Sequence, residues 1–369
     1  MHIQRKEYTR FREGSVQGRY VTLDHILPFI NAMSIHFKVV QEGISVQGLP
    51  IRSLTMGSGN LKILMWSQMH GNESTTTKAL LDLLNYLASE SPLAKTILKA
   101  CKLQVIPILN PDGAKSYTRL NANAIDLNRD AQLLTQPESK VLNEVYRLFK
   151  PDFCFNLHDQ RTIWNVAGTR EPATVSFLAP AFDMTRSVSG NRISSMRLIV
   201  AMNQALQPMI PGQVGRYDDS FNANCIGDTL QMIGIPTVLV EAGHFEGDYQ
   251  REQTRELIFW ALLKGLETLA NDDLAVFAVQ DYFMIPESEK LFFDILIKNL
   301  HVINPKYQNG TALGILFNEV LEQNAVQFIP TLEVLEKGWK NYGHRTYDCD
   351  DPESLAALKN ESFWSDIVN

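Results

Sequence analysis

The stretch 61-LKILMWSQMHGNESTTTKALLDLLNYLAS-89 reads as a buried strand, a tight turn and a helix in succession. The apolar run that ends at Trp66 has the length and composition of a strand covered on both faces. A small polar turn follows, and the apolar positions of residues 77–89 then recur with helical spacing. His70 and Glu73 lie at the junction, three residues apart. Other motifs in the sequence indicate why an imidazole and a carboxylate lie together at the end of a buried strand.

The same alternation of short apolar runs and longer amphipathic runs continues from about residue 36 to residue 275. It predicts an α/β fold, with a mostly parallel mixed sheet flanked by helices, in one domain over residues 1–275. After 271-NDD-273 the apolar stretches are shorter, which predicts a small, mainly β region over residues 276–369 of unknown role. We expect strands at 37–43, 61–67, 102–109, 152–157, 174–179 and 236–242, and helices at 74–89, 137–150, 191–206 and 251–270.

The composition excludes several classes of protein. Of 369 residues, 45% are hydrophobic and 20% are charged, which is ordinary for a globular chain with a large core. The net charge of −7 and the lack of a Lys/Arg cluster disfavour nucleic acid and anionic membranes as partners. No apolar run approaches the roughly 18 to 20 residues of a membrane span. The four cysteines form no C-x-x-C pair and the N-terminus has no signal-peptide core, so we expect a cytoplasmic protein with reduced thiols.

Polar or ionisable residues follow four of the predicted strands. In open α/β sheets, ligands bind outside the carboxyl ends of the strands. Each ending alone would suit a solvent-facing rim, but together the four predict a single polar cleft. The endings are 70-HGNE-73, 110-NPDG-113, 158-HD-159 and 241-EAGH-244, and 126-DLNR-129 follows soon after the second.

Two histidines and one glutamate from these endings match a ligand set of catalytic zinc. His70, Glu73 and His158 would leave one coordination position for water. The H-x-x-E spacing alone is a weak signal, because the same residues suit the start of a helix. In that alternative, Asn72 or Ser74 caps the helix and Glu73 interacts favourably with the helix dipole.

The motifs taken in order resemble the zinc metallocarboxypeptidases, the carboxypeptidase A-like family, over roughly residues 36–270. The resemblance implies one zinc ion per chain, held by His70, Glu73 and His158. It also implies that Asp126 orients the first ligand histidine, fixing its tautomer and ring direction. The matching motifs are 70-HGNE-73, 110-NPDG-113, 126-DLNR-129, His158 and Glu241.

The resemblance also assigns roles in catalysis and substrate binding. Glu241 matches the general base, and Arg119 is similar in position to the arginine that polarises the scissile carbonyl. Asn128 and Arg129 match the pair that binds the terminal carboxylate of the substrate, a task that suits the planar fork of arginine. Tyr217 is a looser match to the tyrosine that closes over the substrate.

Two features depart from the peptide-digesting members of the family. Asn72 stands where these often carry arginine, and the segment 216–228, which would line the side-chain pocket, aligns only roughly. The H-G-N-E and D-L-N-R forms also look like those of the aspartoacylase and succinylglutamate desuccinylase branch, which cleaves N-acyl amino acids. The motif 110-NPDG-113 is closer to the peptidases.

The sequence therefore predicts a zinc-dependent hydrolase that removes a C-terminal amino acid from a peptide. One alternative is an N-acyl amino acid deacylase with the same zinc chemistry. In both, the substrate carries a free carboxylate. Another alternative is a non-catalytic, zinc-containing peptide-binding module, although Glu241 and Arg119 together count against it, because a pure binder needs no base.

Several other polar residues are expected to be structural. Arg161 and Arg170 are assigned to the solvated surface, and Cys225 to a small apolar filler. His244 is given a structural or supporting role, because the ligand set is already complete. The segment 341-NYGHRTYDCDDPES-354 is interpreted as a polar surface loop and not as a second metal site.

Overall fold

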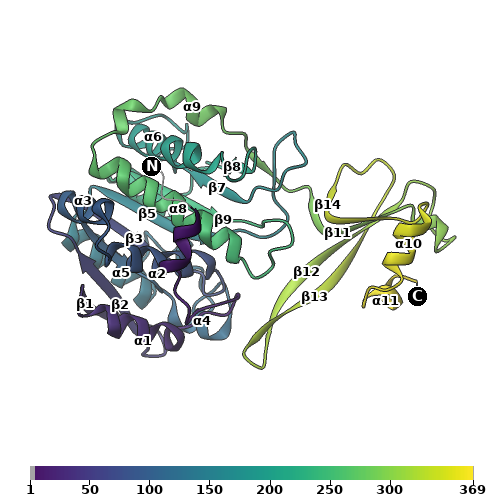
Figure 1. Ribbon diagram of the computed structural model, residues 1–369, viewed down its shortest axis with the longest axis horizontal. Coiled ribbons are helices and arrows are strands. Elements are labelled where there is room, and N and C mark those ends of the chain that lie inside the picture. The colour runs from purple at the N-terminus through teal and green to yellow at the C-terminus, as the bar shows by residue number, and fades with distance from the viewer. Residues whose placement is uncertain (1–4, 369) are drawn as a thin grey trace.

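A computed structural model describes residues 5–368 and contains a large mixed sheet with helices on both faces, followed by a smaller C-terminal sheet (Figure 1). This architecture confirms the predicted fold class, including the mainly β C-terminal region. The division into domains at residue 275 stays a prediction. No helix in the described part of the chain is long and apolar enough to cross a membrane.

The large sheet has eight strands in the order β1-β2-β4-β3-β5-β9-β7-β8. Its centre is parallel, because β3 pairs in parallel with both β4 and β5, and β5 with β9. β2 and β7 join this centre antiparallel to their inner neighbours. The strands are β1 (Lys38–Ile44), β2 (Pro50–Met56), β3 (Leu61–Trp66), β4 (Cys101–Ile106), β5 (Phe153–Asp159), β7 (Val175–Leu178), β8 (Val214–Arg216) and β9 (Thr237–Ala242).

Two hydrophobic cores cover the two faces of this sheet. In β3, Ile63 and Met65 pack in the core under α1, α2, α3, α6 and α8, whereas Leu64 and Trp66 pack in the core under α5 and α7. A strand buried on both faces needs apolar residues at every position, which explains its continuous apolar run. The helices are α1 (Leu23–Met33), α2 (Thr75–Leu87), α3 (Pro92–Ala100), α4 (Pro111–Ser116), α5 (Pro137–Phe149), α6 (Gly190–Leu206), α7 (Ile226–Met232) and α8 (Glu252–Ala270).

The C-terminal sheet has the strand order β13-β12-β11-β14. The expectation of a polar loop at 341–354 is wrong over its first half, which forms β14 in parallel pairing with β11. Sequence alone did not supply this partner strand, which is about fifty residues away, and the ring of His344 in β14 stacks on that of Phe292 in β11. The elements are α9 (Val279–Met284), β10 (Ser288–Glu289), β11 (Phe292–Lys298), β12 (Ala312–Glu322), β13 (Ala325–Leu335), β14 (Tyr342–Asp348), α10 (Pro352–Leu358) and α11 (Trp364–Val368).

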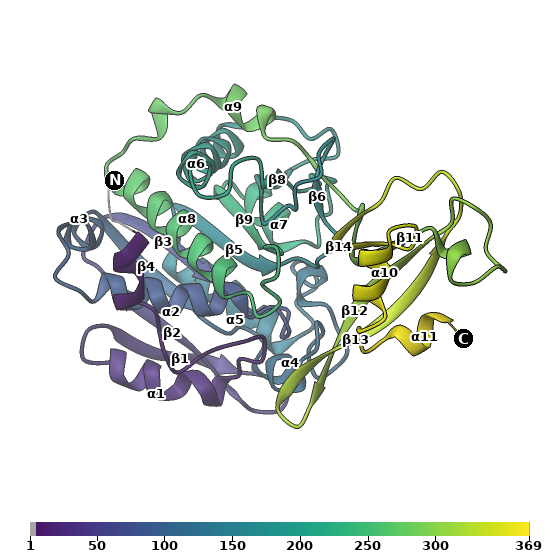
Figure 2. The same ribbon diagram turned by 45° about the vertical axis from the view of Figure 1, so that its right-hand side comes forward.

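Several contacts attach the C-terminal sheet to the rest of the chain, and two of them involve short or protruding strands. The two-residue strand β10 pairs with β6 (Asn165–Val166), which lies in the loop after β5. The long hairpin of β12 and β13 reaches back toward α4 (Figure 2). There Glu319 accepts a hydrogen bond from Tyr117 and forms an ion pair with Arg19 at 3.1 Å. The C-terminal region is therefore bonded to both the middle and the beginning of the chain.

Candidate metal centre and active site

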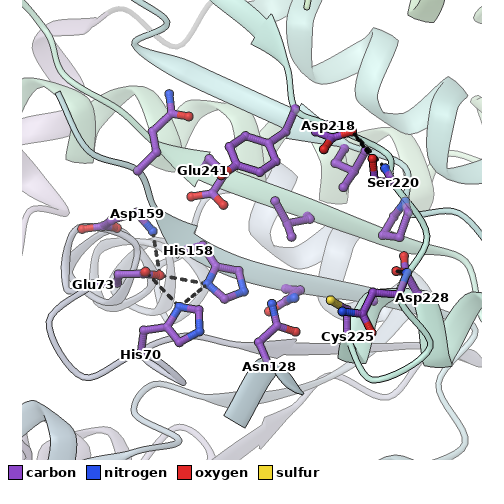
Figure 3. Close-up of a pocket in the computed structure, with 18 of the residues that line it drawn as sticks. His70, Glu73, Asn128, His158, Asp159, Asp218, Ser220, Cys225, Asp228 and Glu241 are labelled. Carbon is purple, nitrogen blue, oxygen red and sulfur yellow. Dashed lines mark hydrogen bonds and ion pairs between the residues drawn. The ribbon is translucent and has the colours of Figure 1, made fainter. Parts of the chain in front are cut away.

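The predicted polar cleft lies at the carboxyl ends of β3, β5 and β9, as a cavity of about 620 Å³ (Figure 3). His70 and Glu73 occupy the turn between β3 and α2. His158 lies in β5, and Glu241 lies directly beside it in β9, because the two residues are register partners. The fold thus brings together four residues that come from three separate parts of the sequence.

Three of these side chains converge on one point. One carboxylate oxygen of Glu73 lies 2.8 Å from Nδ1 of His70, and the other lies 2.8 Å from Nδ1 of His158. The two Nδ1 atoms are 3.1 Å apart, and all the donor atoms lie within 4.8 Å of one another. Two imidazole nitrogens that face each other and a carboxylate form a donor set that suits a zinc ion. The predicted ligands are thus close enough to share a metal.

A backbone contact fixes the turn that carries His70 and Glu73. Gly71 lies so close to Gly113 that a Cβ at Gly71 would be 1.9 Å from the carbonyl carbon of Gly113. Asn110 joins the two segments, since its side chain donates to the carbonyl of Met69 and accepts from the N–H of Gly113. The segment 110–113 therefore supports this ligand turn, which carries two of the candidate ligands.

Asp126 lies where the resemblance implied. Its Oδ1 is 3.1 Å from Nε2 of His70, on the side of the ring opposite Glu73. Its carboxylate also accepts from the backbone N–H of Asn128 and from Arg119. Although burial acts in the other direction, these partners lower the pKa of Asp126, so it stays a charged acceptor. This contact can hold the His70 ring with Nδ1 directed at the predicted metal position.

Glu241 differs from the other carboxylates of the cavity. Within residues 5–368, its buried Oε2 atom has no hydrogen-bond partner. Burial, followed by the negative charges of Glu73 and Asp159, raises its pKa well above the ordinary value. Figure 3 shows its carboxyl group directed toward the space above His158. A carboxylate with these properties is a good proton acceptor once a positive charge lies nearby.

The remaining predicted residues also line the cavity. Arg119 spans Glu73 and Asp126, at 3.2 and 3.1 Å. The side-chain carbonyl of Asn128 accepts from the N–H of Ile226, which leaves its amide NH₂ available for a ligand. Tyr217 lines the cavity with its ring 5.0 Å from that of Trp164. Arg129, Asn128 and Tyr217 are therefore within one cavity with the candidate ligands.

Other residues with an expected structural role fall into two groups. Arg161 and Cys225 line the cavity, and Cys225 accepts a hydrogen bond from Arg129 at 3.1 Å. Arg170 instead stacks over the ring of Tyr342, and His244 packs between Tyr249 and His344 at the contact with the C-terminal sheet.

Sequence reasoning gave no role to Asp159, although it stood in one of the polar strand endings. Asp159 accepts hydrogen bonds from the backbone N–H groups of Thr75 and Thr76, and so ties β5 to the start of α2. Its position directly after His158 was a signal that could have been followed. Trp164 and Lys290 also line the cavity, but they lie outside the strand endings, and Lys290 belongs to the C-terminal region.

The family comparison agrees with this geometry. Residues 29–162 match the family model described as zinc carboxypeptidase. The predicted family resemblance is confirmed. The matched segment includes His70, Glu73 and His158, whereas Glu241 lies beyond it. The zinc carboxypeptidase-like segment thus carries all three candidate ligands.

Individual carboxypeptidases show how far the similarity extends. The chain is 31% identical to Carboxypeptidase 2 of Trichophyton rubrum over 100 residues, 27% of this chain and 19% of that protein. It is 37% identical to Carboxypeptidase SOL1 of Arabidopsis thaliana over 87 residues, 20% of this chain and 18% of that protein. The chain thus matches only about a fifth of the length of these curated relatives.

Solved structures extend the likeness of fold. A metallo-carboxypeptidase from Burkholderia cenocepacia superposes with a TM-score of 0.56 at 18% identity, over 68% of this chain and 70% of the other. Carboxypeptidase A from Helicoverpa armigera gives a TM-score of 0.55 at 15% identity, over 69% and 74%. The carboxypeptidase fold is therefore present here.

Proposed function

We propose that this protein is a zinc-dependent hydrolase that removes a C-terminal amino acid from a peptide. The observation that carries the proposal is the convergence of His70, Glu73 and His158 beside the partnerless carboxylate oxygen of Glu241. A metal-binding module without catalysis would need the first three residues but not the fourth. The zinc carboxypeptidase match over residues 29–162 supports the same reading.

In this proposal His70, Glu73 and His158 hold one zinc ion. Zinc in such a site lowers the pKa of a coordinated water toward about 7 and polarises a carbonyl group. Glu241 accepts the proton of the attacking water and passes it to the leaving amine. Its buried position, 8% exposed, keeps bulk water from competing for that proton.

Arg119, Asn128, Arg129 and Tyr217 bind and position the substrate in this proposal. Arg119 stabilises the negative charge that develops on the scissile carbonyl oxygen. Asn128 and Arg129 take the terminal carboxylate, which fixes the scissile bond against Glu241. The free amide NH₂ of Asn128 and the exposed guanidinium of Arg129 are suited to this role. Tyr217 covers the bound substrate.

Metal analysis and turnover of three variants test the proposal. Wild-type protein and His36→Ala, a change at an exposed histidine, should each bind about one zinc ion. His158→Ala should lose the metal. Glu241→Gln should keep the metal and lose about 10²- to 10⁴-fold in turnover, because only the proton acceptor is removed.

Substrate pairs separate the proposed reaction from its alternatives. N-blocked dipeptides with a free C-terminus and N-acetyl amino acids are compared at equal concentration. Release of the C-terminal amino acid from the dipeptides supports the peptidase. Turnover of N-acetyl amino acids alone would make the protein a deacylase, and zinc binding without any hydrolysis would leave a binding module. Near-wild-type turnover of metal-loaded Glu241→Gln would show that Glu241 is not the base.

A further inference from the structure

The lining of the cavity combines residues of the loop after β5 with a residue of the C-terminal region. Arg161 and Trp164 lie in the loop after β5, and Lys290 lies between β10 and β11. The Nζ atom of Lys290 is 4.8 Å from the centre of the Trp164 ring, within the range of a cation–π interaction. We call Arg161, Trp164 and Lys290 the cationic wall.

Hydrogen bonds on both sides of Lys290 hold it at this wall. Glu289 is paired with Asn165 in the short ladder of β10 and β6. Asn165 also accepts from the backbone N–H of Leu291 at 3.2 Å, and the carbonyl of Ile163 accepts from the N–H of Phe292 at 3.1 Å. The backbone position of Lys290 is thus set by the bonds that attach the C-terminal sheet, although its side chain is exposed.

The two cations of the wall lack carboxylate partners. Across residues 5–368, neither Arg161 nor Lys290 forms an ion pair, whereas Arg119 in the same cavity pairs with Glu73 and Asp126. The cavity also contains carboxylates outside the catalytic centre, but these are bonded within their own loop. Asp218 accepts from Ser220, and Asp228 accepts from the N–H of Asn222. Two positive charges therefore remain available to a ligand.

The cationic wall adjoins the catalytic centre. The ring of Trp164 lies 5.0 Å from the ring of Tyr217, which is proposed to cover the substrate. The terminal carboxylate of the substrate is already assigned to Asn128 and Arg129. The side chain of the leaving amino acid is expected to face residues 216–228, so we place a further anionic group that reaches the wall on the acyl side of the scissile amide.

We propose that the cationic wall binds a second carboxylate, carried by the acyl part of the substrate. This inference rests on the proposed function and narrows its substrate class to dianionic amides. Arg161 and Lys290 attract the carboxylate, and the face of Trp164 packs against the methylene groups that carry it. Two chemical sources fit, namely an acidic side chain at the penultimate residue of a peptide and a dicarboxylic acyl group on an amino acid.

Binding to zinc-loaded Glu241→Gln tests the wall without requiring turnover. N-acetyl-Glu-X is compared with N-acetyl-Gln-X, and N-succinyl-X with N-butanoyl-X, where X is Ala, Phe or Lys. Calorimetry should show about three- to tenfold tighter binding of the dianionic member of one pair, as expected for two partly exposed cations. The difference should shrink as the salt concentration rises. The pair in which the dianionic ligand binds more tightly identifies the source of the carboxylate.

Variants then assign the preference to the wall. Arg161→Gln and Lys290→Met are added together to Glu241→Gln. This change should bring the ratio of affinities for the dianionic and the monoanionic ligand close to one. Lys290→Arg in the same background should keep the ratio. Arg170→Gln is the matched control, since this arginine also stacks on an aromatic ring but lies outside the cavity. The control should show the same ratio of affinities as Glu241→Gln alone. Zinc content of each variant confirms an intact centre.

The possible outcomes separate the two proposals. Equal affinity for both members of every pair, or a preference that survives loss of both cations, overturns the cationic wall. Wild-type enzyme that cleaves the C-terminal residue from peptides, and that cleaves the dianionic and the monoanionic member of both pairs equally well, would support the proposed hydrolase and overturn the wall. Discrimination by Glu241→Gln combined with no cleavage by wild-type protein would support the wall and overturn the hydrolase.

Discussion

At the scale of single residues, the lack of a side chain at Gly71 determines where the ligand turn can lie. Gly71 separates His70 from the rest of the ligand turn, and the backbone of Gly113 fills the place where its Cβ would be. The opposing atoms belong to the backbone of another segment, so they cannot move aside as a flexible side chain would. The position of the His70 imidazole therefore depends on a contact between two backbones.

Gly71→Ala should weaken zinc binding and destabilise the fold. The new methyl group forces the ligand turn away from α4, and overpacking of this kind costs about 1 to 3 kcal/mol. Gly190→Ala is the control, because a Cβ at Gly190 meets nothing within 4 Å. Zinc titration and urea unfolding of both variants provide the measurement. Equal zinc affinity in Gly71→Ala and wild type would show that the turn tolerates the shift.

Some residues of the cavity could be identified from sequence and others could not. His70, Glu73 and His158 follow predicted strands, and parallel strands bring their carboxyl ends to one edge of a sheet. Lys290 follows no strand of that sheet, and the pairing of β10 with β6 and the hydrogen bonds beside it bring it to the cavity. A contact between two-residue strands leaves no periodic pattern from which it could be predicted.

At the scale of elements, a buried ion pair joins α2 to α8. Two nitrogens of Arg255 donate to the two carboxylate oxygens of Asp82 at 2.7 and 2.6 Å, and both side chains are fully buried. Tyr8 also donates to this carboxylate. The pair fixes the packing of the helix that begins at the ligand turn, so it contributes to the position of Glu73.

Asp82→Asn should destabilise the protein by about 3 to 5 kcal/mol, because it leaves the guanidinium of Arg255 buried without its main partner. Glu90→Gln is the control, since it removes the ion pair between Glu90 and Lys95 on the surface. That change should cost at most about 1 kcal/mol. Chemical denaturation of both variants gives the comparison, and equal losses would mean that the buried pair contributes no more than the exposed one.

The prediction of elements was best where burial is uniform. β5 and β9 were expected within a few residues because each is buried throughout and contains a short apolar run, and the long helices α2 and α8 were expected from the helical spacing of their apolar residues. β2 and α7 were missed. β2 has an irregular burial pattern near the edge of the sheet, and α7 is a seven-residue helix whose cavity-lining loop aligned only roughly with the family. In both cases tertiary contacts outweigh local pattern.

At the scale of the whole molecule, two histidines, His244 and His344, lie at the contact between the residues after β9 and the C-terminal sheet. The rings of His244 and His344 are 4.3 Å apart, and His344 also stacks on Phe292. Neither ring nitrogen of His244 has a hydrogen-bond partner in the described chain. Burial lowers the pKa of His244 well below its ordinary value and lowers that of His344 to about 4. Both rings are therefore neutral in the folded protein near pH 7.

The stability of the protein should fall as the pH drops below about 6.5. Because the pKa of each histidine is depressed by folding, the unfolded chain takes up the protons first, and stability present above pH 6.5 is lost toward pH 4. Each histidine contributes a slope of at most about 1.4 kcal/mol per pH unit. Urea unfolding between pH 8 and pH 5 measures this slope.

A variant at His244 assigns the slope to the contact between this histidine and the C-terminal sheet. His244→Phe keeps an aromatic ring against Tyr249 and removes one titrating group, so its slope should be smaller than that of wild type. His36→Phe changes an exposed histidine and should leave the slope unaltered. If His244→Phe and wild type lose stability equally between pH 6.5 and pH 5, the histidine contact is not the source.

The attachment of the last part of the chain also sets an order of events during protein synthesis. The N-terminal part of a nascent chain emerges from the ribosome first, and domains generally fold in that order. His70, Glu73, His158 and Glu241 all leave the ribosome before Lys290 does. A nascent chain that has emerged as far as residue 275 thus holds every candidate zinc ligand and still lacks the last residue of the cationic wall.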